Sequence, residues 1–329
     1  MRRPFDWYGV VTIALLVPRF LQAQTPPATP AAAPHPCEVQ SGPTKAVCRA
    51  GYDALVSVLP VASLGAGGGN PGIGSAAGGR GFGDISVTLR ATYLRTVLPS
   101  TAFDGTTDTV PAARRLPVAV PSVEVRFGLL RKTLPMGAAT VDFLGSMIGV
   151  PKSATDYVRY SSDIRTLEGL ALGFGYGVRI GVAPNGPLPT VSLNVGRHDF
   201  PKFTVGDLGA GSQFAYTVAV SAINARLMLG RRFSGFELSA GAGADLIKGN
   251  YSLVYRDQAT KLPVPRADSS QSAMRIVTVM NAAFPIGFLR LSFEGGFQVG
   301  KDDKLATVFE AHNPKSGRFF GGVGLGFKL

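Results

Sequence analysis

The chain has 329 residues, of which 42 are glycine and only 16% are charged, and its formal net charge is +12. So much glycine and so little charge is unusual for a soluble globular domain. The basic residues are scattered, without a basic helix or a basic-aromatic module, so the composition argues against nucleic-acid binding. Anionic partners such as lipid headgroups or lipopolysaccharide-like molecules suit the charge better.

The N-terminus resembles a secretory signal peptide. Two arginines precede an apolar stretch from Val10 to Val17, and Ala23 offers a small residue for cleavage. We therefore expect residues 1–23 to direct export. Residues 24–36 are rich in proline and alanine and predict an extended linker.

The next segment, residues 37–83, contains the two cysteines of the chain. An exported protein enters an oxidising compartment, so Cys37 and Cys48 are expected to form a disulfide. Apolar spacing predicts a short helix from Thr44 to Leu59 that ends at Pro60. A glycine-rich connector follows and would let the helix fold back onto the strands predicted below, against the periplasmic mouth of the barrel that they form or partly into it. Two cysteines with irregularly spaced neighbours make a weak metal site, so neither metal nor cofactor is expected.

From residue 84 to residue 329 the sequence alternates between apolar and polar residues over long stretches. This period-2 pattern predicts about ten β-strands, with about eight to twelve as the range to consider. The predicted strands span residues 84–98, 118–130, 138–148, 167–182, 188–198, 213–229, 235–256, 272–283, 286–299 and 317–329.

The connectors between these strands are alternately long and short. Those after the odd-numbered strands are long, whereas those after the even-numbered strands are tight turns such as the one that opens at Ala183. This order is typical of an all-β, transmembrane antiparallel β-barrel with periplasmic turns, long outer loops and both termini in the periplasm. A soluble sandwich or lipocalin-like barrel is the alternative, but soluble strands average about 5 to 6 residues. The length of the strands here suits a bilayer crossing.

One face of each strand carries apolar side chains, and the other carries small or charged ones. Placing the oily face outward sends five basic and five acidic side chains into the lumen, which predicts ion pairs across it. Ten strands favour a largely occluded lumen, and a narrow solute path is the alternative. The predicted lumen-lining charges are Arg90, Glu124, Arg126, Asp142, Arg179, Glu237, Asp245, Arg275, Arg290 and Glu294.

Both ends of this region resemble bacterial outer-membrane β-barrels of the small porin-like class. The final GRFFGGVGLGFKL, with Gly324, Phe327 and Leu329, resembles their C-terminal insertion signal, and GFGDISVTLRATYLR from Gly81 resembles their first strand. The resemblance implies an outer-membrane location and recognition by the barrel-assembly machinery. It is specific for architecture and names no substrate.

The sequence predicts the function less specifically than the fold. We expect a narrow-pore or structural protein that is not an enzyme, with small solutes as possible cargo. One alternative is a barrel whose long loops bind an external partner. Another is a hydrolase at the rim, because His198 beside Asp199 resembles the acidic and histidine residues of omptin proteases, although the resemblance covers only this pair.

Overall fold

The computed structural model describes residues 37–70, 78–79, 81–151, 158–160, 166–167, 170–186, 188–300, 307–309 and 317–328. The predicted signal peptide, the proline-rich linker, most of the glycine-rich connector and Leu329 lie outside these ranges.

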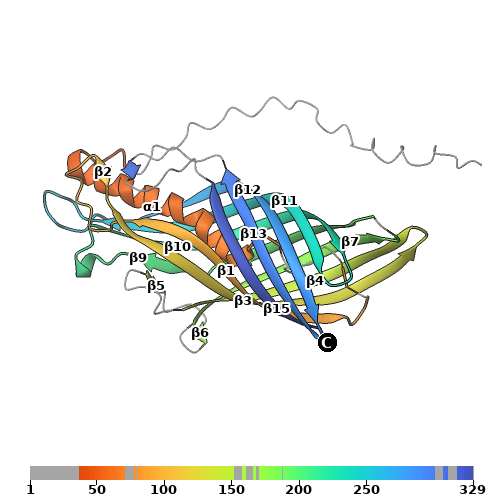
Figure 1. Ribbon diagram of the computed structural model, residues 1–329. Helices are drawn as coiled ribbons and strands as arrows, with labels where there is room; N and C mark the ends of the chain where they lie inside the picture. The colour runs from red at the N-terminus through yellow and green to blue at the C-terminus, as the bar shows by residue number, and fades with distance from the viewer. Residues whose placement is uncertain are drawn as a thin grey trace, which may run out of the picture.

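Ten long antiparallel strands form a closed barrel (Figure 1). The last strand pairs with the first, from Ser86 opposite Lys328 to Leu94 opposite Phe320, and this pairing closes the wall. The predicted ten-stranded barrel is confirmed. Its strands are β1 (Ile85–Pro99), β3 (Ala112–Leu134), β4 (Gly137–Pro151), β7 (Leu170–Pro184), β8 (Thr190–Asp199), β10 (Phe214–Arg232), β11 (Glu237–Tyr255), β12 (Ala267–Ile286), β13 (Leu289–Gly300) and β15 (Arg318–Lys328).

The connectors alternate as predicted. Tight turns occupy one end of the barrel, at 135–136, 185–189, 233–236 and 287–288. The longer connectors at the other end carry the remaining short elements. These are β2 (Thr109–Val110), β5 (Val158–Tyr160), β6 (Thr166–Leu167), β9 (Phe203–Val205), the 3-10 turn η1 (Leu208–Ala210) and β14 (Val308–Phe309).

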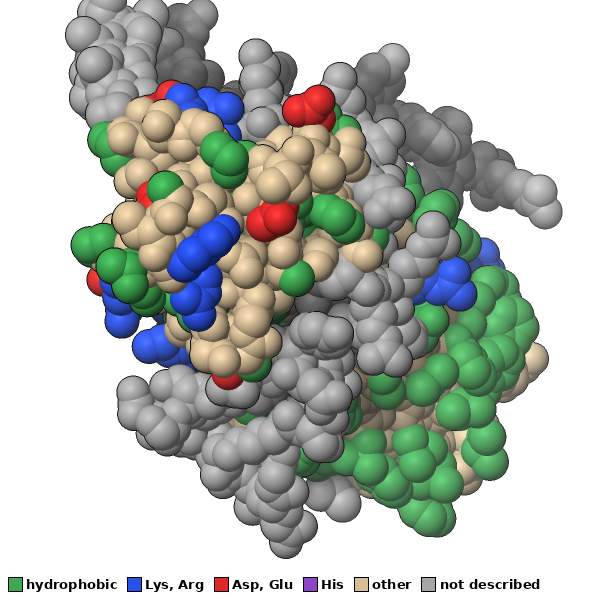
Figure 2. Space-filling model, turned by 90° about the vertical axis from the view of Figure 1, so that its left-hand side faces the viewer, with side chains coloured by type: hydrophobic (Ala, Val, Ile, Leu, Met, Phe, Trp, Pro, Cys, Tyr) green, Lys and Arg blue, Asp and Glu red, His purple; other side chains and the backbone are tan. Residues whose placement is uncertain are grey.

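The outer surface of the barrel is apolar where the strands run toward the tight turns. On β7, Phe174, Tyr176, Val178 and Ile180 point outward and are 40 to 57% exposed, while the residues between them are buried inside. Figure 2 looks onto the end with the long connectors and shows charged and polar side chains there, with a broad hydrophobic surface on the flank. An apolar band of this extent around a closed barrel requires a lipid environment.

A single helix, α1 (Gly42–Gly67), lies inside the barrel rather than beside it. It contacts β1, β3, β7, β8, β10, β11 and β12, which surround the lumen. Nineteen of its 26 residues are buried, as expected for a helix that is apolar around most of its circumference. It is long and apolar enough to cross a bilayer by composition, but 89% of its apolar window is buried within the protein.

The helix extends well beyond the predicted stop. Pro60 lies in its interior, and the helix continues to Gly67. Proline removes one backbone hydrogen bond and usually ends a helix. Here the surrounding wall packs on both sides of Pro60, and tertiary packing supplies most of a helix's stability in proteins.

The start of α1 lies at the end of the barrel with the long connectors. Thr44 Oγ1 donates a hydrogen bond to Asp257 and accepts one from the Gln258 N–H, both in the connector after β11. Asp53 accepts hydrogen bonds from Thr307 in the connector before β15. By contrast, β1 begins at the tight-turn end.

Of the two positions considered for the helix, the structure shows the one inside the barrel and not the one at the tight-turn mouth. The expectation that both termini lie on one side is wrong for the described chain, whose two ends lie at opposite ends of the barrel. An even number of strands returns the chain to the side where the first strand began. The helix adds a further passage along the lumen, which moves Cys37 to the other end.

The predicted disulfide joins Cys37, ahead of the helix, to Cys48 in its second turn. Beside this bond, Glu38 forms ion pairs of 2.7 Å with Lys45 and Arg49 of the helix. Hydrogen bonds from Arg49 and Lys45 lower the pKa of Glu38 to about 2. The start of the helix is thus held by a covalent bond and by contacts to the long connectors.

The assignment of lipid-facing and lumen-facing side chains can be tested by substitutions on β7 and β1. Val178→Arg places a charge in the apolar band, and we expect it to impair membrane insertion by about 2 to 4 kcal/mol. Thr88→Arg, whose side chain enters the interior, should insert normally. Heat-modifiable migration on gels after refolding into vesicles measures both. Equal behaviour of the two variants would contradict the assigned faces.

The position of Cys37 at the end with the long connectors can be tested with epitopes. An epitope inserted directly before Cys37 should bind antibody on intact cells, as should one inserted after Thr107 in a long connector. An epitope after Asn185, in a tight turn, should bind only after permeabilisation. Protection of the epitope before Cys37 together with exposure of the one after Thr107 would show that the helix does not traverse the barrel in the membrane.

Candidate functional site: the interior of the barrel

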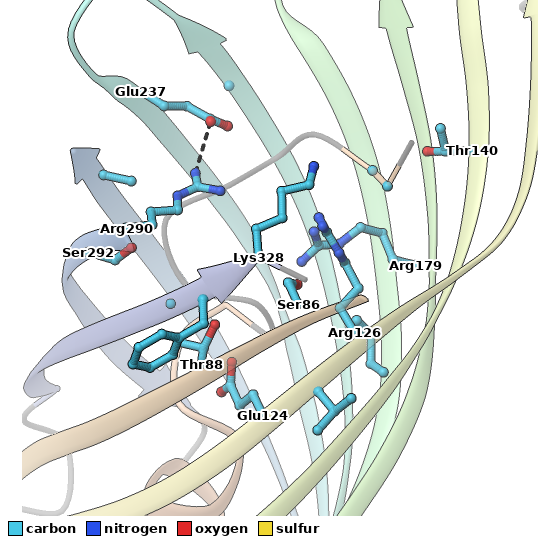
Figure 3. Close-up of a pocket in the computed structure, with 18 of the residues that line it drawn as sticks. Ser86, Thr88, Glu124, Arg126, Thr140, Arg179, Glu237, Arg290, Ser292 and Lys328 are labelled. Carbon is cyan, nitrogen blue, oxygen red and sulfur yellow. Dashed lines mark hydrogen bonds and ion pairs between the residues drawn. The ribbon is translucent and has the colours of Figure 1, made fainter. Parts of the chain in front are cut away.

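The interior divides into a polar chamber, a collar of ion pairs and an apolar half that contains the helix. The chamber is a cavity of about 900 Å³ in the half of the barrel that ends in the tight turns (Figure 3). Two acidic side chains, Glu124 and Glu237, line it. The basic side chains that line it are Arg126, Arg131, Arg179, Arg232, Arg290 and Lys328.

Two acidic side chains around the chamber, Glu237 and Asp84, each contact two basic groups. Glu237 lies 2.9 Å from Arg290 and 3.5 Å from Arg232. Asp84, just before β1, lies 3.2 Å from both Arg126 and Lys328. Shared carboxylates leave the wall with more positive than negative charge.

At the inner end of the chamber, Glu294 forms the first part of the collar. Its carboxylate accepts hydrogen bonds from the backbone N–H groups of Gly69 and Asn70, at 3.1 and 2.9 Å, and it forms an ion pair with Arg90. Arg90 also pairs with Glu124 at 2.9 Å and donates to the Asn70 carbonyl. The chain that leaves α1 is therefore fixed to β1 and β13.

Asp245 forms the second part of the collar. It accepts from Arg226, Asn224 and Gln298, all of which are almost fully buried. Arg226 Nε in turn donates to the Gly69 carbonyl at 2.9 Å. Charges this deeply buried are tolerable only when they are paired and hydrogen-bonded, and here the partners come from both the wall and the helix end.

The turn that ends the helix requires glycine. Gly68 has φ of +58°, and its N–H donates to the Leu64 carbonyl. A Cβ at this position would lie 1.8 Å from Arg90 Nη2. A side chain here would displace the arginine that holds the collar together.

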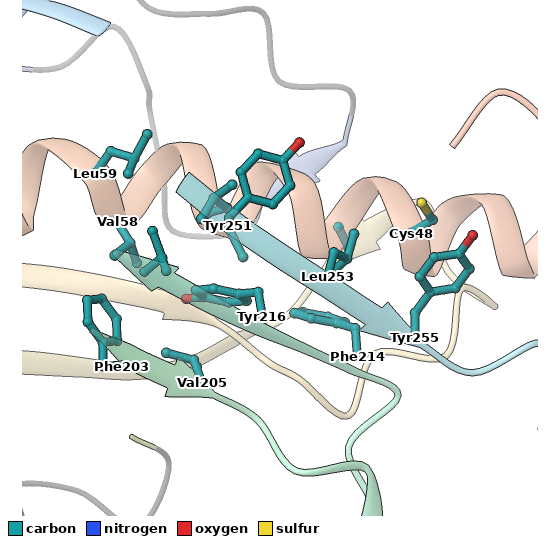
Figure 4. Packing of buried hydrophobic residues seen from close by; sticks show 14 of the residues in the cluster. Cys48, Val58, Leu59, Phe203, Val205, Phe214, Tyr216, Tyr251, Leu253 and Tyr255 are labelled. Atoms are coloured by element: carbon teal, nitrogen blue, oxygen red, sulfur yellow. The ribbon is translucent and has the colours of Figure 1, made fainter. Parts of the chain in front are cut away.

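The third part of the interior is the apolar half around α1 (Figure 4). Phe214 and Tyr216 of β10 and Leu253 of β11 point inward and are almost fully buried against the helix. Leu55 and Leu59 of α1 belong to the same cluster. The buried polar groups of this half include Asp53, which accepts hydrogen bonds from Thr307, and Ser57, which donates to the Asp53 carbonyl.

All ten predicted lumen-lining charges point inward, but they do not form one site. Arg90, Glu124, Asp245 and Glu294 belong to the collar. Arg126, Arg179, Glu237 and Arg290 line the chamber. Asp142 accepts from the Gly79 N–H with both oxygens at 3.0 Å, and Arg275 is buried opposite Asp245 in the strand register.

Sequence reasoning missed other groups that these charges depend on. Arg226 is the most important, because it pairs with Asp245 and holds the helix end. The available signal was the alternation of the strand. Ile223 and Leu227 face the lipid, so Arg226, at a position of opposite parity, faces the lumen. Asp84, Lys328 and Asn70 were also missed, because each lies at the end of an element. The predicted insertion signal places Gly324 inward and Phe327 on the opposite face.

The structure places His198 in the lumen rather than on the rim. Its Nδ1 lies 3.3 Å from Ser146 Oγ, and its side chain is buried. Asp199 faces the other side of the strand and forms an exposed ion pair with Arg197. The two neighbours therefore do not converge on one site. Among the described residues, no three His, Cys, Asp or Glu side chains lie together as a metal site requires.

A scan against models of protein families gives no match, and a search of curated protein sequences gives none. Solved structures with a similar arrangement include the outer membrane protease OmpT from Escherichia coli, with 11% identity and a TM-score of 0.38 over 75% of this chain and 95% of that one. The translocator domain of the autotransporter NalP from Neisseria meningitidis has 11% identity and a TM-score of 0.33 over 74% and 88%. Neisserial surface protein A has 11% identity and a TM-score of 0.29 over 74% and 97%.

At this sequence identity and TM-score, the similarity to these structures supports no inference about individual site residues. The closed antiparallel barrel and its apolar band carry the assignment of fold. This is the fold of bacterial outer-membrane β-barrels.

The collar predicts a large effect from a single residue. Glu294→Ala leaves Arg90 and two backbone N–H groups without their main acceptor, and we expect a loss of about 3 to 5 kcal/mol in the free energy of unfolding. Asp268→Ala breaks the exposed pair with Arg266 and should cost under about 1 kcal/mol. Urea titration of the refolded protein measures both. If Glu294→Ala lowered the free energy of unfolding no more than Asp268→Ala, the collar would not be a main source of stability.

Proposed function

We propose that this protein is an outer-membrane barrel closed by its own N-terminal helix, with a structural or narrow-pore role and no steady conduction while the helix is seated. The observation that carries the proposal is the path of α1 through the lumen, with the collar at its end. Open aqueous channels belong to barrels with about 16 or more strands, and the interior of this barrel is divided between the helix, the collar and the chamber.

The two ends of the barrel differ in a way that supports this role. The long connectors contact the start of α1, so the helix, the disulfide and the connectors form one unit at that end. The tight-turn end keeps the chamber. A solute that enters the chamber meets the collar, where Arg90, Arg226 and their partners occupy the lumen.

The proposal includes a location and partners. The apolar band supports insertion among outer-membrane lipids, and the N-terminal pattern of Arg2 to Ala23 supports export. Recognition by the barrel-assembly machinery belongs to the same proposal. We do not propose catalysis, because His198 and Asp199 face opposite sides of β8 and the hydrogen bond of His198 to Ser146 is long for a nucleophile and its base.

Conductance across a planar bilayer tests the closed state. The full chain should give no steady current. Leu59→Asp places a charge in the apolar half and should unseat the helix, so that assembled barrels conduct. Val39→Asp makes the same kind of change at a residue that is 82% exposed and should stay silent.

Assembly of every variant is verified by heat-modifiable migration. Steady current through the unmodified protein would refute the proposal. So would assembled Leu59→Asp barrels that remain as silent as Val39→Asp barrels.

A further inference from the structure

The chamber at the tight-turn end carries an excess of positive charge. Among the residues that the structure describes, six basic and two acidic side chains line it. Counting Asp84 and Asp142, which lie beside the cavity, still leaves two bases in excess. Moreover, Asp84 and Glu237 are each shared between two basic groups.

The basic groups also lie close to one another. Figure 3 shows the guanidinium groups of Arg126 and Arg179 side by side with Lys328 next to them. Two observations agree with this view: Asp84 contacts both Arg126 and Lys328, and Arg179 lies close enough to both Arg126 and Asp142 for their charges to interact. Asp84 lies between Arg126 and Lys328, so its single negative charge is shared by two positive charges. Like charges within a low-dielectric wall repel one another where the counter-charge is shared in this way.

We propose that the chamber binds an anion that bears phosphate or carboxylate groups and enters from the tight-turn end. Arg126, Arg179 and Lys328 would hold its charged groups, because guanidinium groups match carboxylate and phosphate oxygens in two-point contacts. Ser86 and Thr88 line the same cavity and supply hydroxyl groups. A volume of about 900 Å³ accommodates a small organic molecule or the headgroup of a lipid.

This site goes beyond the closed-barrel proposal and does not depend on it. The collar separates the chamber from the helix, so binding can be measured whether or not the barrel conducts. A soluble anion and a lipid headgroup share the required chemistry. The experiment therefore has one arm for each source.

In the first arm, the full chain in a neutral detergent is titrated calorimetrically with pyrophosphate and with citrate. In the second arm, the unfolding temperature is measured in nanodiscs with and without phosphatidylglycerol. Arg126→Gln and Lys328→Gln remove one basic group each from the chamber. Arg266→Gln is the matched control, because it lies at the opposite end of the barrel in an exposed pair.

We expect binding in at least one arm, weakened about tenfold by Arg126→Gln or Lys328→Gln, which is the loss of one charge-assisted hydrogen bond. Arg266→Gln should bind as the unmodified protein does. Calorimetric binding identifies a soluble anion, and stabilisation by phosphatidylglycerol alone identifies a lipid headgroup. The proposal is overturned if neither arm gives an effect, or if Arg266→Gln weakens binding as much as the two chamber variants.

Discussion

The width of a ten-stranded barrel is the constraint on which the rest of the structure depends. Eight strands leave an interior that side chains just fill, so ten strands leave a space that something else must occupy. A helix is about 10 to 12 Å across with its side chains and fits that space. The chain supplies one from its own N-terminal segment, and α1 fills the half of the lumen nearest the long connectors. The other half stays polar and contains the chamber.

This division explains why the oily face of a strand changes side along its length. In β10, Phe214, Tyr216 and Val218 point inward against the helix, whereas Ile223 and Leu227 point outward. Inward apolar residues belong where the helix is the neighbour, and outward ones where lipid is. A barrel filled only by water and polar side chains needs no inward apolar residues of this size.

The strands and their connectors could be predicted because both follow from local rules. Where lipid lies on one side and small or charged residues on the other, as around Val178 and Arg179 in β7, period-2 alternation gives the faces directly. The interior was harder to predict. The switch of faces in β10 is a sequence signal for an occupant of the lumen, but two-residue alternation by itself does not say what the occupant is.

The helix was predicted at its start and misjudged at its end, and the sequence left its position open. Pro60 is a sound local reason to stop a helix, but burial on all sides outweighs that preference. Its position inside the barrel depends on contacts between residues far apart in the sequence, such as Gly69 with Arg226, which are 157 residues apart. The ten charged residues could be assigned to the lumen by parity. Their partners could not, because pairing depends on strand register and on the path of the helix end.

The apolar half and the collar hold the helix in different ways. Packing between apolar side chains has no direction, so a shift of α1 along the barrel would exchange one apolar contact for another at modest cost. The collar permits only one position. The N–H groups of Gly69 and Asn70 must meet Glu294, and the Gly69 carbonyl must meet Arg226. A shift of α1 by one residue along the barrel would leave a buried charge unpaired. The free-energy cost of that unpaired charge exceeds what new apolar contacts could recover. The collar therefore sets the depth of the helix, and with it the boundary at which the apolar half ends and the basic chamber begins.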